Sequence, residues 1–432
     1  MNRRSKRLIA GIISMAMAFV TAFAGVGTVN AKQVGRILMD STENGNYSGY
    51  HAVIDRTYMY KVSGTAHVVS LQNNVLTDYT LTKSFGVKSK KTVNLPKYYV
   101  WGGYFHSEHG TNYVALGYNN SKEKADANVI KVIQYDKSWH KKKVAEIKGS
   151  ASNDPGKGVS LPFYVGNASF AEYGNTLYLF TSRKIFGANN QTNIAFAINT
   201  KSMKATVENH NFTSHSFNQI CRFADGNLYT VDHGDGNPRG VKITFYDGYG
   251  KFASDVGVGG HRGSVVAFTF LGDKTNNYTG AKVSGMEASA KNLLVTGTAQ
   301  PHNSTIDGVK GFSSSYGENL YLIKRDRSTN TGSVRWLTSY NPKTSGVSVD
   351  RSRLVKISKN RFGIIYSVLN KSKNTRTCYC MIIDGEGKIL KNTEYKDIQF
   401  RGGTQPIVVG DNIVFVERPS NGKAQIYSIP IK

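Results

Sequence analysis

The chain has 432 residues and carries 55 Lys and Arg against 29 Asp and Glu, which gives a formal net charge of +26 at pH 7. This length is ample for a large hydrophobic core, and only three cysteines exclude both a disulfide framework and the cysteine spacing of zinc sites. The basic excess favours attraction to an anionic polymer, such as teichoic acid or an acidic polysaccharide, with a merely solubilising surface as the alternative. Specific recognition of nucleic acid is not expected, because no nucleic-acid motif occurs.

The first 31 residues have the pattern of a secretory signal. A basic start with Arg3, Arg4, Lys6 and Arg7 precedes an apolar run, and Val29-Asn30-Ala31 offers small residues for cleavage. We therefore expect residues 1–31 to be removed and residues 32–432 to be secreted, with non-covalent retention at the cell wall where retention occurs. The apolar run is long, so an uncleaved membrane anchor is the alternative.

Short alternating runs bounded by Gly, Asn, Asp and Ser, with 25 Tyr and 20 Phe, predict an all-β chain of many short strands. One unit recurs about every 50 to 70 residues, which suits a four-stranded propeller blade with long loops. The predicted second strands of the units are Tyr58–Val62, Asn112–Leu116, Leu177–Phe180, Leu228–Val231, Leu293–Val295, Phe362–Tyr366 and Ile413–Val416.

Hairpins with Asp-Gly or Asp-Lys turns predict the third and fourth strands of three units. They pair Val129–Tyr135 with Lys142–Ile147, Val241–Tyr246 with Phe252–Val256, and Cys378–Ile383 with Lys388–Tyr395. Cys378 and Cys380 should share one face of a strand and so not bridge.

The last unit, from Gln405 to Ile431, is one strand short, and the strand-like segment Gln33–Met39 is expected to supply that strand and close the ring. The sequence thus predicts one β-propeller domain of seven four-stranded blades. Six or eight blades remain alternatives, because the region Val266–Tyr340 can be divided differently.

The densest group of chemically capable side chains lies between Ser214 and Arg239. Two predicted strands, Phe217–Phe223 and Asn227–Val231, flank a turn at Asp225-Gly226, and a loop is expected to follow. Gly234 permits a bend that would gather two carboxylates and an imidazole, with an arginine as an anion clamp. The alternative is that these groups cap turns and fix blade loops. The loop residues are Asp232, His233, Asp235 and Arg239.

Other candidates come from predicted inner strands, which line the central channel of a propeller. His215, Asn218 and Gln219 belong to such a strand, although hydrogen bonding between blades is an equal alternative. Tyr104 and His106, beside Glu108 and His109, form a second cluster that could face the same channel. The candidate ligand-binding residues are His215, Asn218, Gln219, Asp232, His233, Asp235, Arg239, Tyr104 and His106. No metal spacing and no phosphate-binding loop occur, so no cofactor or metal is expected.

Several segments resemble a family of secreted propeller-domain proteins from Gram-positive, mostly clostridial, bacteria. The most specific are Ser214–Gln219, which reads SHSFNQ, and Val231–Asp235 with Pro238-Arg239. Weaker support comes from Gly102–Phe105, from Asn277–Gly280 with Gly285 and Glu287, and from Leu354–Ile357. The resemblance implies a propeller and secretion but no activity. The chain departs from the family at Phe180–Lys184 and at Asn189–Gln191, where relatives carry histidines.

The pattern favours a monomeric binding protein at or near the cell envelope, with a glycan or an anionic envelope polymer as ligand. The alternative is a polysaccharide-degrading enzyme, a lyase or a hydrolase, that uses the fourth-blade cluster. Such an enzyme requires convergence of His215, His233, Asp235 and Arg239 in one concave pocket. A third reading is a structural surface protein without a small-ligand site.

Overall fold

The computed structural model describes residues 27–28, 32–37, 55–154, 156–165, 168–208, 212–234, 239–247, 260–272, 279–302, 313, 315–341, 343, 346–417 and 424–432. Every regular element in these ranges is a strand, so the predicted all-β class is confirmed. These ranges also hold no apolar helix of membrane-spanning length. Apart from Gly27–Thr28, the predicted leader lies outside the described residues.

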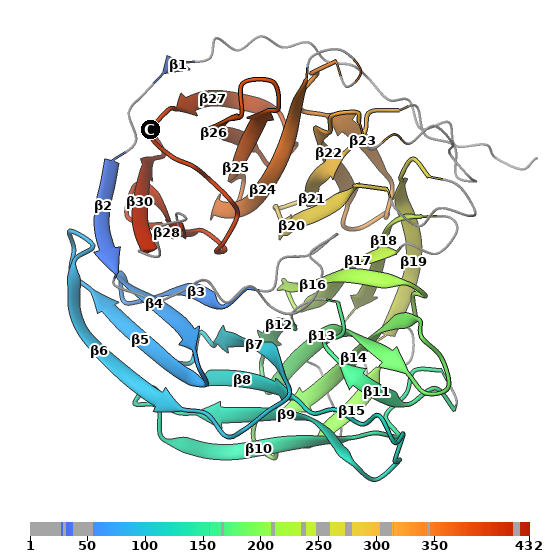
Figure 1. The fold of residues 1–432 in the computed structure, drawn as a ribbon. Coiled ribbons are helices and arrows are strands. Elements are labelled where there is room, and N and C mark those ends of the chain that lie inside the picture. The colour runs from blue at the N-terminus through green and yellow to red at the C-terminus, as the bar shows by residue number, and fades with distance from the viewer. Residues whose placement is uncertain are drawn as a thin grey trace, which may run out of the picture.

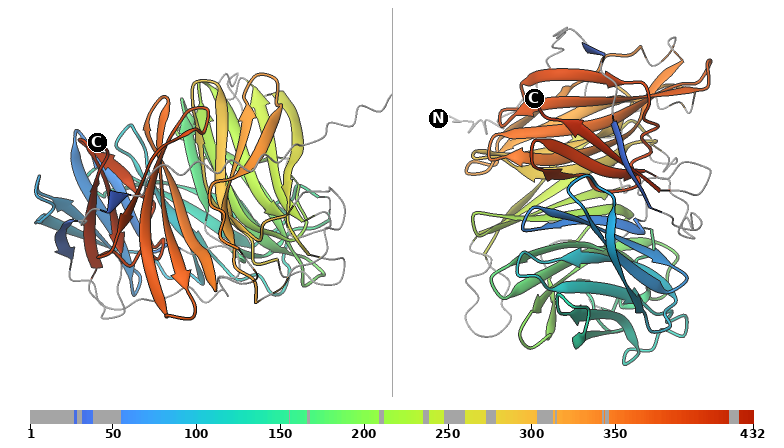
Figure 2. Two further views of the ribbon diagram at one scale, coloured as in Figure 1. Left: turned by 90° about the horizontal axis from the view of Figure 1, so that it is seen from above. Right: turned by 90° about the vertical axis from the view of Figure 1, so that its left-hand side faces the viewer.

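The strands form seven antiparallel sheets arranged as blades around a central axis (Figure 1), which confirms the predicted seven-bladed propeller. In the further views, the red and orange blades lie opposite the teal ones across the ring (Figure 2). Five sheets have four strands, and two have a short fifth strand.

The first four blades follow the chain in order. Blade one consists of β3 (Thr57–Val62), β4 (Thr65–Gln72), β5 (Val75–Leu81) and β6 (Val87–Asn94). Blade two consists of β7 (Val100–His106), β8 (Asn112–Gly117), β9 (Asn128–Tyr135) and β10 (Lys141–Lys148). Blade three consists of β11 (Val159–Pro162), β12 (Ser169–Tyr173), β13 (Thr176–Ile185), β14 (Gln191–Asn199) and β15 (Ala205–Glu208). Blade four consists of β16 (Ser216–Ala224), β17 (Asn227–Gly234), β18 (Gly240–Asp247) and β19 (Gly260–Thr269).

The remaining blades include both ends of the chain. Blade five consists of β20 (Lys282–Ala288), β21 (Asn292–Ala299), β22 (Asn319–Asp326) and β23 (Gly332–Trp336). Blade six consists of β24 (Val347–Ser358), β25 (Arg361–Asn370), β26 (Thr375–Asp384) and β27 (Ile389–Tyr395), with β1 (Gly27–Thr28) added in parallel to β27. Blade seven consists of β28 (Ile407–Val409), β29 (Asn412–Glu417), β30 (Ala424–Pro430) and β2 (Lys32–Ile37).

The ring is closed by the N-terminal strand β2, as the sequence predicts. β2 pairs antiparallel with β30, with Gln33 opposite Tyr427, and Figure 1 shows the dark blue strand beside the red one. It thereby becomes the outermost strand of blade seven, next to three strands from the C-terminal end. Joining the two ends within one sheet ties the first and last parts of the chain together.

Two predicted strand assignments are wrong. Tyr58–Val62 is the innermost strand of blade one, and the second strand is β4, whereas the other six predicted second strands match. The turn Ser63-Gly64 joins β3 to β4 and has φ of 46° and 79°, the geometry of a tight hairpin. Its first residue is a serine, where Asn or Asp is usual, so the sequence indicates this turn only weakly. In blade four, the fourth strand is β19, while the predicted Phe252–Val256 lies outside the described residues.

The hydrophobic core lies between neighbouring blades. Because side chains alternate between the two faces of a strand, each strand contributes to two interfaces. Leu228 of β17 packs with Tyr178 and Phe180 of blade three, whereas Tyr229 and Val231 of β17 pack with blade five. The two cysteines Cys378 and Cys380 are buried and unbridged on β26, as predicted.

Candidate functional site

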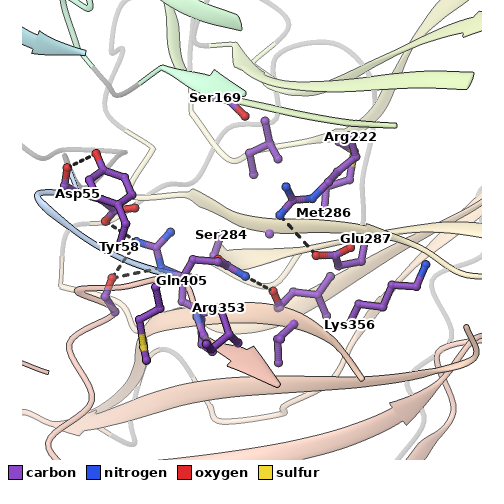
Figure 3. A pocket seen from close by; sticks show the side chains of 18 of the residues that line it. Asp55, Tyr58, Ser169, Arg222, Ser284, Met286, Glu287, Arg353, Lys356 and Gln405 are labelled. Carbon is purple, nitrogen blue, oxygen red and sulfur yellow. Dashed lines mark hydrogen bonds and ion pairs between the residues drawn. The ribbon is translucent and has the colours of Figure 1, made fainter. Parts of the chain in front are cut away.

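A cavity of about 600 Å³ lies within the ring, and residues on or beside the innermost strands of all seven blades line it (Figure 3). These strands are β3, β7, β12, β16, β20, β24 and β28. The propeller therefore assembles one site from segments that are far apart in the sequence.

The cavity lining is strongly basic. Its described residues include six Lys and Arg side chains but only two carboxylates. The basic residues are Lys61, Arg222, Lys282, Arg351, Arg353 and Lys356, and the acidic residues are Asp55 and Glu287. Such an imbalance creates a positive potential, which the low-dielectric walls of a cavity concentrate.

The first carboxylate, Asp55, is paired with Arg353. Nη2 of Arg353 lies 2.8 Å from Oδ1 of Asp55, and the guanidinium also donates to the carbonyl of Gly402 at 2.8 and 3.1 Å. Burial raises the pKa of Asp55 to about 6, although the charge of Arg353 opposes that rise. Because these residues come from blade six and from the segments before β3 and β28, the pair joins three parts of the ring.

The second carboxylate, Glu287 of β20, faces Arg222 of β16 across a blade boundary (Figure 3). Their Oε1 and Nη2 atoms are 3.4 Å apart. Burial raises the pKa of Glu287, while the charges of Arg222 and Lys356 lower it. Nε of Arg222 is buried and has no hydrogen-bond partner within the described part of the chain. The contact with Glu287 therefore satisfies only part of the hydrogen-bonding capacity of this guanidinium.

Two lysines of the lining, Lys61 and Lys356, form no close ion pair within the described part of the chain. Nζ of Lys356 donates to the carbonyl of Ala288 at 2.7 Å, and Nζ of Lys61 donates to the carbonyl of Val408 at 3.0 Å. A carbonyl oxygen is neutral, so neither contact cancels the positive charge. By contrast, Lys282 forms an ion pair with Glu318 at 2.9 Å.

Four of the residues proposed from the sequence line this cavity, namely Tyr104, His106, Asn218 and Gln219. Parts of the second-blade and fourth-blade clusters therefore meet. Nδ2 of Asn218 also donates to the carbonyl of Val283 at 2.7 Å, which is the hydrogen bond between blades considered as its alternative. Nε2 of Gln219 donates to Oγ of Ser216 within its own strand.

Asp232 and His233 lie on a strand, and the predicted loop position is wrong. β17 continues through Gly234, pairing Asp232 with Gln219 and His233 with Asn218. Consecutive residues of a strand point to opposite faces. The carboxylate of Asp232 accepts hydrogen bonds from Asn193 at 2.8 Å and from Ser216 at 3.0 Å, towards blade three.

The ring of His233 lies on the other face of β17. It packs edge-on against Phe217 and Phe270, with ring centroids 5.9 and 5.1 Å away. The side chain is fully buried. Asp232 and His233 therefore cannot act on one ligand together, and neither lines the central cavity.

The rest of the fourth-blade cluster also lies away from the cavity lining. His215, at φ of 54°, has its Nδ1 atom 2.8 Å from Oγ of Ser214. Arg239 is buried, and its carbonyl accepts a hydrogen bond from the amide of Phe270. Neither residue lines the cavity. Asp235 and Pro238 lie outside the described residues. The convergence that an enzyme built on this cluster requires is not seen for the three described candidates, His215, His233 and Arg239.

Sequence reasoning gave no site role to the charged residues of the lining, and two of these, Arg222 and Glu287, share one register. Arg222 pairs with the third residue of β17, and Glu287 pairs with the third residue of β21, so they occupy equivalent places in neighbouring blades. Reading the strand before each predicted second strand would have singled out both residues. Glu287 and Leu354–Ile357 did belong to the segments that carry the family resemblance, but without an assigned role.

No group of three or more His, Cys, Asp or Glu side chains in the described ranges is arranged to hold a metal ion. No family model matches the chain, and no curated protein matches it. The family resemblance seen in the sequence therefore stays a prediction.

Solved structures resemble the chain over most of its length, at low identity. An oligogalacturonate lyase in complex with manganese shares 10% identity at a TM-score of 0.46, with 93% of this chain and 98% of that chain covered. The polysaccharide lyase Uly1 also shares 10% identity at 0.46, covering 97% and 95%. Drosophila plexin A in complex with semaphorin 1b shares 9% identity at 0.47, covering 94% and 88%. Likenesses this distant carry no argument about activity.

Proposed function

We propose that the protein binds an anionic ligand in the central cavity, and that this ligand is a segment of an acidic glycan or of another anionic polymer of the cell envelope. The observation that supports the proposal is the charge of the lining, six cationic side chains against two carboxylates. Both carboxylates already have an arginine partner. The remaining positive charge, at Lys61 and Lys356 above all, is available to an anion.

In this proposal the protein is secreted, with residues 1–31 as its leader, and works as a monomer near the cell envelope. A degradative activity built on the fourth-blade cluster has less support, because His215, His233 and Arg239 do not line the cavity. The ligand class, the location and the monomeric state rest on the sequence patterns together with the basic cavity.

Binding of short acidic oligosaccharides tests the cavity. By calorimetry, the mature protein should bind an oligomer of a uronic acid and not a neutral oligosaccharide of the same length, and the affinity should fall as salt is added. Lys356→Met should weaken binding by about 10- to 150-fold, since a charge-assisted hydrogen bond contributes about 1.5 to 3 kcal/mol. Lys373→Met removes the same charge from an exposed turn of blade six and should change nothing. Equal binding of the neutral oligomer would contradict the proposal.

The outer edge of the ring offers a second basic surface. The lysines of β6 and β10 are exposed, and Nζ of Lys91 on β6 donates to the carbonyl of Ser138, in the turn just before β10. Asp136 compensates one of them, Lys142, at 3.1 Å. The exposed lysines are Lys88, Lys90 and Lys91 on β6, and Lys141, Lys142, Lys143 and Lys148 on β10. This surface suits retention on an anionic envelope polymer.

The triple variant Lys88→Gln, Lys90→Gln and Lys141→Gln should elute from an anionic polymer matrix at distinctly lower salt than the unaltered protein, because exposed charges attract over a Debye length of about 8 Å at physiological salt. Its affinity for a short uronic acid oligomer should not change. The matched control replaces Lys371, Lys373 and Lys388, all exposed in blade six, by glutamine. Equal shifts for both triple variants would show that net charge alone governs retention.

A further inference from the structure

We propose that His106 accepts a hydrogen bond from a hydroxyl group of the ligand, so that the cavity selects anions that also carry hydroxyl groups, as sugar acids do. This inference rests on the proposed function, in which the cavity holds an anion. It adds a specificity-determining residue on the blade-two wall of the cavity and narrows the ligand to an acidic saccharide.

The orientation of the Asn112 amide is fixed by a backbone carbonyl. Its Nδ2 atom lies 3.1 Å from the carbonyl oxygen of Asp136, which can only accept. Oδ1 of Asn112 must therefore point the other way, where it accepts from the hydroxyl of Tyr104 at 2.7 Å. The same oxygen lies 2.8 Å from Nδ1 of His106. Because an amide oxygen carries no hydrogen, Nδ1 of His106 must be the protonated, donating nitrogen.

The second ring nitrogen of His106 is then left with a lone pair. Burial lowers the pKa of His106, and the nearby His67 acts in the same direction, while Asn112 and Asp78 oppose it. The ring is thus neutral near pH 7, and in a neutral imidazole one nitrogen donates while the other accepts. Nε2 of His106 is therefore an acceptor.

This acceptor faces the cavity. His106 belongs to the cavity lining, and its Nε2 atom makes no hydrogen bond within the described part of the chain and is not a sealed, buried atom. Tyr60 covers one face of the imidazole, with ring centroids 3.9 Å apart and planes 24° from parallel. Oη of Tyr60 is itself held by Asp78 at 2.7 Å, which fixes the stack. A ligand can reach Nε2 along the ring edge, the direction of its lone pair.

The combination of groups gives the selectivity. Lysine and arginine side chains only donate hydrogen bonds, so they recognise an anion but cannot accept from a hydroxyl. The aromatic residues Tyr58, Tyr60 and Tyr104 also belong to the cavity lining and pack against one another beside His106. An anion that also carries a hydroxyl group uses both the cationic side chains and the acceptor, whereas a phosphate chain without hydroxyls uses the cationic side chains alone.

Three probes test the inference by calorimetry. They are a short uronic acid oligomer, the same oligomer with its hydroxyl groups methylated and its carboxylates free, and inorganic tripolyphosphate. The unaltered protein should bind the uronic acid oligomer about tenfold more tightly than the methylated oligomer, since about 1.4 kcal/mol corresponds to a factor of ten. His106→Phe keeps a ring but loses the acceptor, and it should reduce this ratio to about one while leaving the affinity for tripolyphosphate unchanged. An unchanged ratio in His106→Phe overturns the role of His106. If no probe binds the unaltered protein, the proposed anion site fails as well.

The protonated nitrogen can also be observed directly, without any ligand. Nitrogen NMR of the imidazole side chains should show His106 with a proton on Nδ1 and a bare Nε2 at pH 7. Asn112→Ala should weaken that preference, because it removes the oxygen that selects the tautomer. A proton on Nε2 in the unaltered protein would overturn the inference even where anion binding is found.

Discussion

Replacing Arg353 by leucine should lower the free energy of unfolding by about 3 to 5 kcal/mol at pH 8, the usual cost of removing one partner of a buried ion pair. The guanidinium holds Asp55 at 2.8 Å and the carbonyl of Gly402, and both ionised side chains are mostly buried, at 17% and 15% exposure. Leucine satisfies neither acceptor. Urea unfolding followed by fluorescence suits the measurement, since Nε1 of Trp101 donates to the carbonyl of Asp55.

The loss should be smaller at pH 5. The pKa of Asp55 is raised by burial from 3.8 to about 6, so the favourable contribution of its protonated form is complete below pH 3.8 and is lost as the pH rises through 6. Without Arg353 the folded-state pKa of Asp55 rises further. More of the variant's loss of unfolding free energy then occurs as the pH is raised from 6 to 8. At pH 5 the carboxyl in the variant can stay protonated.

Arg351→Leu is the matched control. This arginine lies on the same strand and also lines the cavity, but its contact with Asp350 is 4.0 Å long. A loose, partly exposed pair of this kind contributes about 0 to 1 kcal/mol. Adding Asp55→Asn to Arg353→Leu should recover much of the stability, because the uncompensated charge is removed. Equal losses for the two arginine variants would show that Arg353 does not hold the ring together through Asp55.

The repeat of the fold could be predicted because it is local. Each blade alternates in hydrophobicity and ends its hairpins with Asp or Gly, so the second strands of six blades and the closing strand β2 follow from the pattern. The exception is blade one, where the Ser63-Gly64 turn carries a weak sequence mark. Because this turn is marked only weakly by its residue types, the first strand of blade one is mistaken for the second.

The site could be predicted only in part, because it depends on contacts between blades. Tyr104, His106 and Asn218 line the cavity, as expected for residues on inner strands. The pairing of Arg222 with Glu287 joins two different repeats, so it appears only when the blades are placed side by side.

The prediction for the fourth-blade cluster is wrong for a different reason. It assumes that residues close in sequence act together. A strand sends neighbours such as Asp232 and His233 to opposite faces, so proximity along the chain separates them in space. The strand was predicted to end too early, at Val231, because Gly and Asp follow closely.

Asp232→Asn should flatten the pH dependence of stability. Between pH 5 and pH 8 the unaltered protein is expected to lose roughly 2 to 3 kcal/mol more than the variant. Burial raises the pKa of Asp232 from 3.8 to about 7, against the opposing hydrogen bonds from Ser216 and Asn193. For a carboxyl with a raised folded-state pKa, the stabilising contribution is complete below pH 3.8 and is lost as the pH rises through 7. Asparagine is neutral throughout and can still accept both hydrogen bonds through its amide oxygen.

The control for this prediction is Asp225→Asn in the same blade. Asp225 is exposed and paired with Arg327 at 2.8 Å, which lowers its pKa, so its loss should change stability equally at pH 5 and pH 8. The contributions of the other carboxyls whose pKa values burial raises are common to all three proteins and cancel; these are Asp55, Glu172, Glu287 and Glu417. If the curves of Asp232→Asn and the unaltered protein run parallel, Asp232 must be ionised at pH 5 in the folded protein. The charge of Lys242, which opposes the rise, would then outweigh the effect of burial.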